Sequence, residues 1–358
     1  MIGVRHALVL GALCGLAGCT GAEYYSQAVG GHLEIMRLAR PIPERIADPA
    51  TPPALRARLE RVEAMRDFAS RELGLPDNGS YRSYADIGRP YAVWNVFVAP
   101  EFSVTARQSC FPVAGCVSYR GYYARPDAER YGAGARARGD DVYIGGVPAY
   151  STLGWFDDPV LSTFIRYPDG ELARLLFHEL AHQVVYVKDD TVFNESFAVA
   201  VEREGVRRWL GQHGTPADRR AYDDLQERKQ AFVAMILRYR DRLDALYREP
   251  LADPDKRVAK QRLIAEMDAD YRALKTEWGG FAGYDRFFAQ KVGNAHFASI
   301  AAYTQLVPGF TALLAREDND LPRFYAAVKA LAARPKAERD AALRKAAASR
   351  PSGIPAAS

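Results

Sequence analysis

The spacing of hydrophobic and polar positions changes along the chain. Between residues 20 and 75, apolar residues recur every three or four positions, which is the period of one helix face, and a proline-rich break separates two such runs. The segment from Tyr91 to Ile144 is instead rich in Val, Tyr and Phe and is punctuated by Gly and Pro, which is typical of strands and turns. The pattern therefore predicts two helices followed by a small, mostly antiparallel sheet.

Helical spacing returns after Tyr167-Pro168. Asp169 is expected to cap a helix over Gly170 to about Val187, because its side-chain oxygen can accept from a free N–H of the first turn. A second helix is expected to begin at Asn194, which is also a good N-cap residue, and to end in the glycines at 211 and 214.

The last part of the chain reads as helical and charged. Residues 216–278 predict a helical hairpin that is interrupted at PLADPD, and residues 336–358 fade into Ala, Pro and Ser, which predicts a disordered tail. We expect an α+β domain over 19–335, with the small sheet ahead of a mainly helical C-terminal half and a helical subdomain over about 216–335.

The N-terminus has the features of an export signal. Residues 1–18 place Arg5 before an apolar run that is too short for the ~20 residues of a spanning helix. The sequence LAGC, ending at Cys19, resembles a bacterial lipobox, whose cysteine carries a lipid. Because Thr20 is not aspartate, the resemblance implies a lipid anchor in the outer membrane, facing the periplasm. The alternative is an ordinary secretory signal that happens to contain a cysteine.

Charge and cysteine content limit the function classes. The chain of 358 residues carries a net charge of only +4, without a dominant basic block, which argues against nucleic acid as a partner. Nothing in the sequence specifies an oligomeric state. Once Cys14 leaves with the signal and Cys19 is lipidated, Cys110 and Cys116 are expected to form a disulfide in an oxidising compartment. A zinc site is the alternative for this pair, but no further Cys or His lies close by.

The helix FHELAH carries the candidate chemistry. His178 and His182 are four residues apart, so their imidazoles share one helix face and can bind one Zn²⁺. Glu179 flanks that point as a general base, which is the arrangement of the H-E-x-x-H motif. Glu195 is the best third ligand, because position 188, where a metzincin has its third histidine, is a lysine. Zinc bound in this way would activate water for peptide hydrolysis. An inactive or purely structural metal site is the alternative.

A family resemblance adds to this interpretation. HELAH followed by NESFA looks like the gluzincin metallopeptidases, and NESFAVAVE is similar to a segment of the aminopeptidase N family, although the connection between the two motifs is shorter here. Over most of residues 19–330 the chain resembles a bacterial family of lipoproteins described as zinc aminopeptidases. The resemblance implies a zincin-like fold, a zinc ion and a peptide substrate.

Further site residues follow from the resemblance. Glu202 lies two turns past Glu195 and would orient a ligand histidine, with a solvated surface charge as the alternative. Tyr150, Tyr303 and His296 are candidates for stabilising the oxyanion, against the alternative of core packing.

The sequence also leaves gaps in this picture. An aminopeptidase needs an acidic residue to bind the α-ammonium group of its substrate, yet the expected edge strand GGVPAYSTLGW contains none. Glu101 or the pair Asp157 and Asp158 could take this role instead. His32 and His213 look like surface or cap residues. The competing hypothesis is a non-catalytic envelope lipoprotein that uses the zinc fold as a binding or assembly scaffold.

Overall fold

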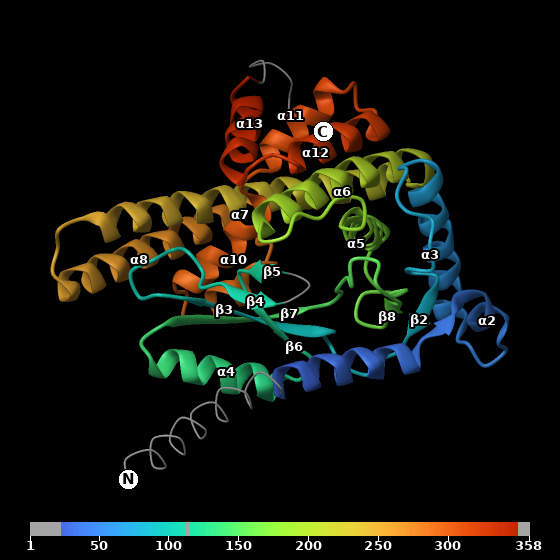
Figure 1. Ribbon diagram of the computed structural model, residues 1–358, viewed down its shortest axis with the longest axis horizontal. Coiled ribbons are helices and arrows are strands. Elements are labelled where there is room, and N and C mark those ends of the chain that lie inside the picture. Colours follow the sequence, from blue (N-terminus) through green and yellow to red (C-terminus); the bar gives the residue numbers. More distant parts are fainter. Residues whose placement is uncertain (1–22, 112–114, 350–358) are drawn as a thin grey trace, which may run out of the picture.

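The computed structural model describes residues 23–111 and 115–349. The predicted signal peptide, 1–18, and the lipidation site Cys19 lie outside the described residues. Figure 1 shows a small sheet between two layers of helices, with α4 beneath it and the helices of the C-terminal half above it. The arrangement is α+β, with the sheet ahead of the helical half in the chain.

The central sheet has the strand order β6-β3-β7 and is antiparallel throughout. Alternate residues of β3 serve its two faces: Val96 and Val98 pack with α4, whereas Phe97 and Ala99 face α10. The strands are β1 (Arg40–Pro41), β2 (Ser83–Ala85), β3 (Val93–Ala99), β4 (Ser109–Phe111), β5 (Gly115–Val117), β6 (Arg120–Tyr122), β7 (Asp141–Val147) and β8 (Val160–Leu161).

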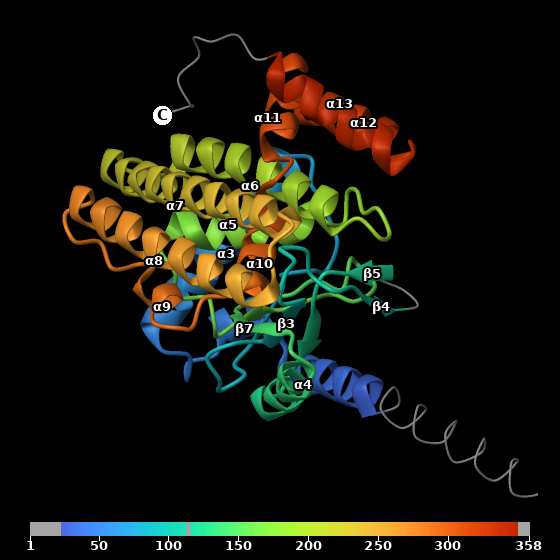
Figure 2. The same cartoon turned by 90° about the vertical axis from the view of Figure 1, so that its left-hand side faces the viewer.

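Residues 23–38 form a helix that lies against the lower face of the molecule in Figure 1. The helices after it are α2 (Ile42–Ala47), α3 (Pro53–Arg71), α4 (Arg125–Ala137), α5 (Asp169–Ala181), α6 (Thr191–His213), α7 (Pro216–Arg248), α8 (Asp253–Glu277), α9 (Asp285–Phe288), α10 (Asn294–Thr304), α11 (Val307–Arg316), α12 (Leu321–Ala332) and α13 (Lys336–Ala348). The expected hairpin is the pair α7 and α8, which lie side by side (Figure 2).

Helices α5 and α6 pack against each other in the main hydrophobic core. Gly205 of α6 permits this close approach, because a Cβ there would lie 2.7 Å from the ring of Phe177. The segment Asn294–Arg316 is long and apolar enough to cross a membrane, but 61% of its apolar window is buried inside the fold, and it is broken between α10 and α11.

The boundaries of α5 and α6 differ from the sequence-based prediction. Helix α5 ends at Ala181 rather than near Val187, and α6 begins three residues before Asn194, with Asp190 as its N-cap. Asp169 is not a cap either: it is the first residue of α5, and its carboxylate accepts hydrogen bonds from Arg58 and Arg61.

Asn194 has a different role from the predicted cap. Its side-chain amide binds both the N–H and the C=O of Val187, each at 2.8 Å, and so fixes the loop between α5 and α6. This loop determines how α6 returns alongside α5. Local cap preference could not show it, because both hydrogen bonds are made across the turn and not to the helix end.

The predicted disordered tail is wrong for residues 336–348, which form helix α13 packed against α11. Leu343 is buried there, and Arg339 and Lys336 form ion pairs with Asp190 at 2.8 and 2.9 Å. Since Asp190 is also the N-cap of α6, the tail helix is tied to the start of the helix that carries Glu195. The Ala- and Lys-rich composition gave no sign of this tertiary contact. Residues 350–358 lie outside the described residues.

The predicted disulfide between Cys110 and Cys116 is present in the structure. It joins β4 to β5, whose ladder pairs the two cysteines directly. Asp189, from the loop between α5 and α6, accepts a hydrogen bond from the backbone N–H of Cys116 at 2.6 Å. The disulfide-linked hairpin is therefore attached to the loop that positions the two candidate metal-binding helices.

Candidate metal centre

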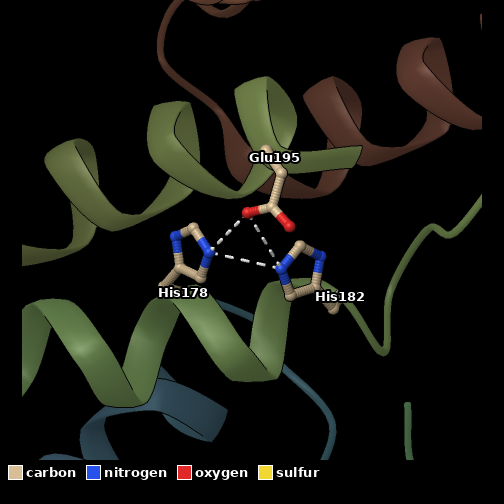
Figure 3. A group of neighbouring side chains, drawn as sticks. All are labelled: His178, His182 and Glu195. Atoms are coloured by element: carbon tan, nitrogen blue, oxygen red, sulfur yellow. Dashed lines mark hydrogen bonds and ion pairs between the residues drawn. The ribbon is translucent and has the colours of Figure 1, made fainter. Parts of the chain in front are cut away.

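His178, His182 and Glu195 direct their side chains to one point between α5 and α6 (Figure 3). The Nε2 atoms of the two histidines are 3.2 Å apart, and Oε2 of Glu195 lies 3.1 Å from the first and 3.7 Å from the second. All three side chains are buried or nearly so, which removes competing water from most of their surface. The three residues that the sequence spacing selected therefore lie together in the structure, as a group that could hold a metal ion.

The separations fit a tetrahedral zinc ion. With Zn–N bonds of ~2.0–2.1 Å and a Zn–O bond of ~2.0–2.2 Å, the ligand atoms of a tetrahedral site are about 3.3–3.4 Å apart. The three observed separations, 3.1, 3.2 and 3.7 Å, bracket this value. Two imidazole nitrogens and one carboxylate oxygen are also a donor set that zinc prefers, and three protein ligands leave a fourth position for water or substrate.

Glu202 contacts His178 on the side of the imidazole ring that faces away from Glu195. Its Oε2 atom is 2.7 Å from Nδ1 of His178, so Nδ1 donates to the carboxylate and Nε2 is left to face the metal point. Arg174 approaches the same carboxylate at 3.4 Å. Nδ1 of His182, by comparison, is buried and has no hydrogen-bond partner in the described part of the chain. The two histidines are therefore oriented by different means.

The electrostatics of the three side chains are tightly coupled. Burial alone would lower the pKa of His178, but hydrogen bonds to Glu195 and Glu202 outweigh burial and raise the pKa well above its usual 6.5. Burial would raise the pKa of Glu195, but the charge of His182 and the hydrogen bond to His178 hold it well below its usual 4.5. A metal ion must therefore displace a proton from His178, so metal affinity should increase with pH.

Replacing Glu202 by glutamine is expected to weaken zinc binding about 10- to 100-fold, because the carboxylate that raises the basicity of His178 becomes a neutral amide. A competition titration against a chromophoric chelator measures this. Glu204→Gln is the matched control, since Glu204 is on the same helix but pairs with Arg207 and Arg208 away from the site. Equal zinc affinity in both variants would remove Glu202 from this role.

The metal point opens into a cavity of about 1030 Å³, which is large enough for a peptide. It lies between the helices α5, α6, α7 and α10 and the strands β3 and β7. Glu179 lines this cavity beside the ligands, and burial raises the pKa of its carboxyl, partly offset by the two histidines. A carboxyl in this environment is suited to take up and release a proton nearer to neutral pH.

Tyr303 of α10 also lines the cavity, as the sequence predicted it could. Burial and the neighbouring Glu195 carboxylate raise the pKa of its phenol well above 10, so the hydroxyl stays protonated and able to donate. Tyr119 lies in the same surroundings, with Glu195 and Glu179 as neighbouring charges, but sequence reasoning missed it. Its segment was read only as strand and turn, and no motif spacing relates it to the metal helix.

Tyr150 lines the cavity too, but its hydroxyl is already engaged: it lies 2.9 Å from Nδ1 of His32. His32 comes from the helix over 23–38, and its ring lies tilted against Phe156 with ring centres 4.6 Å apart, so it is half-buried and in contact with other side chains and not a free surface residue as predicted. His213, at the end of α6, stacks on Trp209 at 4.1 Å, in keeping with its predicted position near a helix end.

His296, a predicted oxyanion-stabilising candidate, lies outside the cavity that holds the other candidates. It does not line the cavity but packs between Tyr143 and Phe287, and its Nδ1 accepts a hydrogen bond from the backbone N–H of Gly293 at the start of α10. Burial lowers its pKa to about 4, which keeps the ring neutral. A buried helix-start residue has the same sequence signature as a catalytic one, which is why the pattern could not separate them.

The acids that the sequence offered for binding a substrate's α-ammonium group lie outside the cavity. Glu101 forms an ion pair with Arg257 of α8, and Asp158 is buried beneath the loop that follows β7, where it accepts from the N–H and hydroxyl of Thr152. Neither lines the cavity. Among the described residues, the only acids that line the cavity are Glu179, Glu195 and Glu202, which lie on or beside the candidate metal site.

Asp158 makes stability depend on pH. Burial raises its pKa from 3.8 to about 7, so between these values the folded chain holds a proton that the unfolded chain has released. Stability should fall as pH rises through this window, by about 4 kcal/mol in total, and should then level off. Asp158→Asn keeps an oxygen for Thr152 and is expected to be more stable than the parent at about pH 8 but not at about pH 4.

Urea unfolding at both pH values checks this expectation, with the exposed neighbour Asp157→Asn as control. A stability difference between the parent and Asp158→Asn that does not change with pH would contradict it.

Comparison with known proteins gave one match. The model of the family described as "Putative aminopeptidase" matches residues 23–343. No curated protein matches the chain. No solved structure matches it either.

Proposed function

We propose that this chain, which belongs to the family described as "Putative aminopeptidase", is a zinc-dependent peptidase. The observation that carries the proposal is the convergence of His178, His182 and Glu195 within 4.8 Å of one another, with Glu179 beside them in a cavity that can hold a peptide. Cofactor, mechanism and substrate class are parts of this proposal. The family supports the hydrolysis of peptide bonds, and the donor set supports zinc.

A zinc ion held by the three ligands would lower the pKa of a water from ~15.7 toward ~7 and polarise the scissile carbonyl. Glu179 accepts a proton from the attacking water and delivers it to the leaving amine, and burial, which raises the pKa of its carboxyl, favours this exchange of a proton. The phenol hydroxyl of Tyr303 donates a hydrogen bond to the oxyanion of the intermediate, and Glu202 holds the ring of His178 in place.

Substrate positioning follows from the edge strand. In the described part of the sheet, β7 lies at one edge, and its residues from Gly145 to Val147 line the cavity. An extended peptide can add to such an edge through backbone hydrogen bonds, which leaves its side chains to the cavity walls. The rings of Tyr91 and Tyr143 occupy the space where side chains at Gly146 and Gly145 would lie, so these two positions of β7 require glycine or a small residue.

Location and fold class are further parts of the proposal. The lipobox-like LAGC supports a lipid anchor on Cys19 and a place in the bacterial envelope, facing the periplasm. The disulfide between Cys110 and Cys116 is in keeping with an oxidising compartment. The order of a small antiparallel sheet, the metal helix and a second ligand helix supports a zincin-like architecture.

Digestion of a peptide library tests the proposal. The chain without residues 1–19 should cleave peptides, lose this activity in a zinc chelator and regain it when zinc is restored. Cleavage that is indifferent to chelation would contradict the zinc mechanism. Full zinc occupancy without cleavage of any peptide would favour the scaffold alternative.

A further inference from the structure

The basic side chains of the cavity are not all paired. Arg174 donates to Glu171 at 2.8 Å and approaches Glu202, so its charge is compensated. Arg203 of α6 and Lys229 of α7 line the same cavity, yet neither forms a hydrogen bond or ion pair with any residue of 23–111 or 115–349. Two uncompensated cations at a partly buried wall are costly unless an anion or water offsets them.

The two cations act on a common region. Arg174, Arg203 and Lys229 all line the cavity, and burial lowers the pKa of Lys229, which the positive charges of Arg174 and Arg203 lower further. Glu202 and Glu171 attract Lys229, but Glu202 is already engaged by His178 and Arg174, and Glu171 is engaged by Arg174. The charges of Arg203 and Lys229 are therefore not neutralised by an ion pair. The three acids that line the cavity lie at the candidate metal site instead.

The helix α6 gives the distance from the metal centre. Glu195 and Arg203 are on this helix and line the cavity, and so does Val199 between them. At 1.5 Å per residue, eight residues separate the ligand from the cation by about 12 Å along the helix axis. An extended peptide covers this distance in about three to four residues, at ~3.3 Å each.

We propose that Arg203 and Lys229 form a subsite that binds a carboxylate of a short peptide, about three to four residues from the bond cut at the metal centre. The free C-terminal carboxylate of an oligopeptide fits this position. The inference rests on the proposed function and names its substrate class. The subsite also explains how a short peptide could be bound without an acid for its α-ammonium group, because the cavity would hold the peptide by its C-terminal carboxylate instead.

The test uses three peptides: tetra-alanine with a free carboxylate, the same peptide as a C-terminal amide, and Ala-Ala-Ala-Glu amide, whose only carboxylate is on a side chain. Binding is measured by calorimetry on the zinc-loaded full chain carrying Glu179→Gln, which cannot turn over the peptide. Cleavage by the parent chain is measured as kcat/KM. The free acid is expected to bind about 10- to 100-fold more tightly than its amide, as for a charge-assisted carboxylate contact.

Arg203→Met and Lys229→Met should each reduce this preference, and the double variant should abolish it while zinc content and thermal stability stay at the parent level. Arg220→Met is the matched control: Arg220 is an exposed cation of α7 that does not line the cavity, and its removal should leave the preference unchanged. Arg203→Lys should keep part of the preference, which a merely structural arginine would not do.

The outcomes separate the two proposals. A preference for the free acid that persists in the double variant, or that is absent from the parent, overturns the carboxylate subsite, while chelator-sensitive cleavage would leave the peptidase assignment intact. Conversely, binding that depends on Arg203 and Lys229 without any cleavage supports the subsite and contradicts the peptidase. If the glutamate amide binds as tightly as tetra-alanine, the subsite reads an acidic side chain; if it binds like the neutral amide, the subsite reads the C-terminus.

Discussion

Glu179→Gln is expected to abolish peptide cleavage while the zinc content stays at the parent level. Glutamine has the shape of glutamate but cannot accept the proton of the attacking water. A positioned general acid–base group contributes about 10²–10⁴-fold to a rate, which corresponds to about 3–5 kcal/mol of the barrier. Glu179 lines the cavity but is not among the three metal-binding side chains, so zinc should remain bound. Steady-state kinetics together with metal analysis of the same sample check both parts.

Glu171→Gln is the control for this variant, because Glu171 lies on the same helix but pairs with Arg174 and does not line the cavity. It should cleave peptides at close to the parent rate. A Glu179→Gln protein that retains the parent rate would exclude Glu179 as the base. Loss of zinc along with activity would show instead that Glu179 supports the metal and not the proton transfer.

Glu195→Ala is expected to eliminate tight zinc binding and the stability that depends on it. The substitution leaves two histidines of α5 without the carboxylate from α6, so the ion would no longer join the two helices. For the parent chain, zinc at 100 times its dissociation constant should raise the free energy of unfolding by about 2.7 kcal/mol. For Glu195→Ala at the same zinc concentration this increase should be absent.

Thermal unfolding with and without zinc measures this difference. Glu204→Ala is its control: Glu204 lies about two and a half turns further along the same helix, contacts Arg207 and Arg208, and its removal should leave the response to zinc intact. A Glu195→Ala chain that is stabilised by zinc as strongly as the parent would mean that the ion binds elsewhere.

The grouping of the three candidate metal ligands was predictable because it depends on local sequence spacing. His178 and His182 share a face through a four-residue spacing alone, and Glu195 is close in sequence, so a short turn is sufficient to bring it back. Glu202 was suggested by the family resemblance together with its place two turns past Glu195, and its contact with His178 at 2.7 Å agrees with that placement. The small antiparallel sheet was equally readable, because its strands are apolar runs bounded by glycine and proline.

The helix boundaries were less predictable, because tertiary contacts override local cap preference. Asp169 and Asn194 are both good cap residues, yet one binds two arginines of α3 and the other fixes a loop. Asp190 is the cap instead, and its remaining charge is compensated by Lys336 and Arg339 of α13. A contact across about 150 residues leaves no trace in a local pattern.

The cavity walls were the least predictable part of the site. Tyr119 is one of 20 tyrosines, and nothing in its neighbours distinguishes it from those that fill the core. Arg203 is one residue past Glu202, but only the position of α7 shows that Lys229 joins it at the same wall. The position of His296 was equally hidden, since a buried imidazole that accepts a hydrogen bond at the start of a helix cannot be told from a cavity residue in the sequence.

The central claim is that one metal ion joins α5 to α6 through His178, His182 and Glu195. Diffraction from crystals of the zinc-loaded chain, recorded on both sides of the zinc absorption edge, tests it most directly. The account predicts one anomalous peak at ~2.0–2.1 Å from Nε2 of each histidine and ~2.0–2.2 Å from a Glu195 oxygen. A peak at other residues, or a zinc ion bound by the histidines with the Glu195 carboxylate turned away, would contradict it.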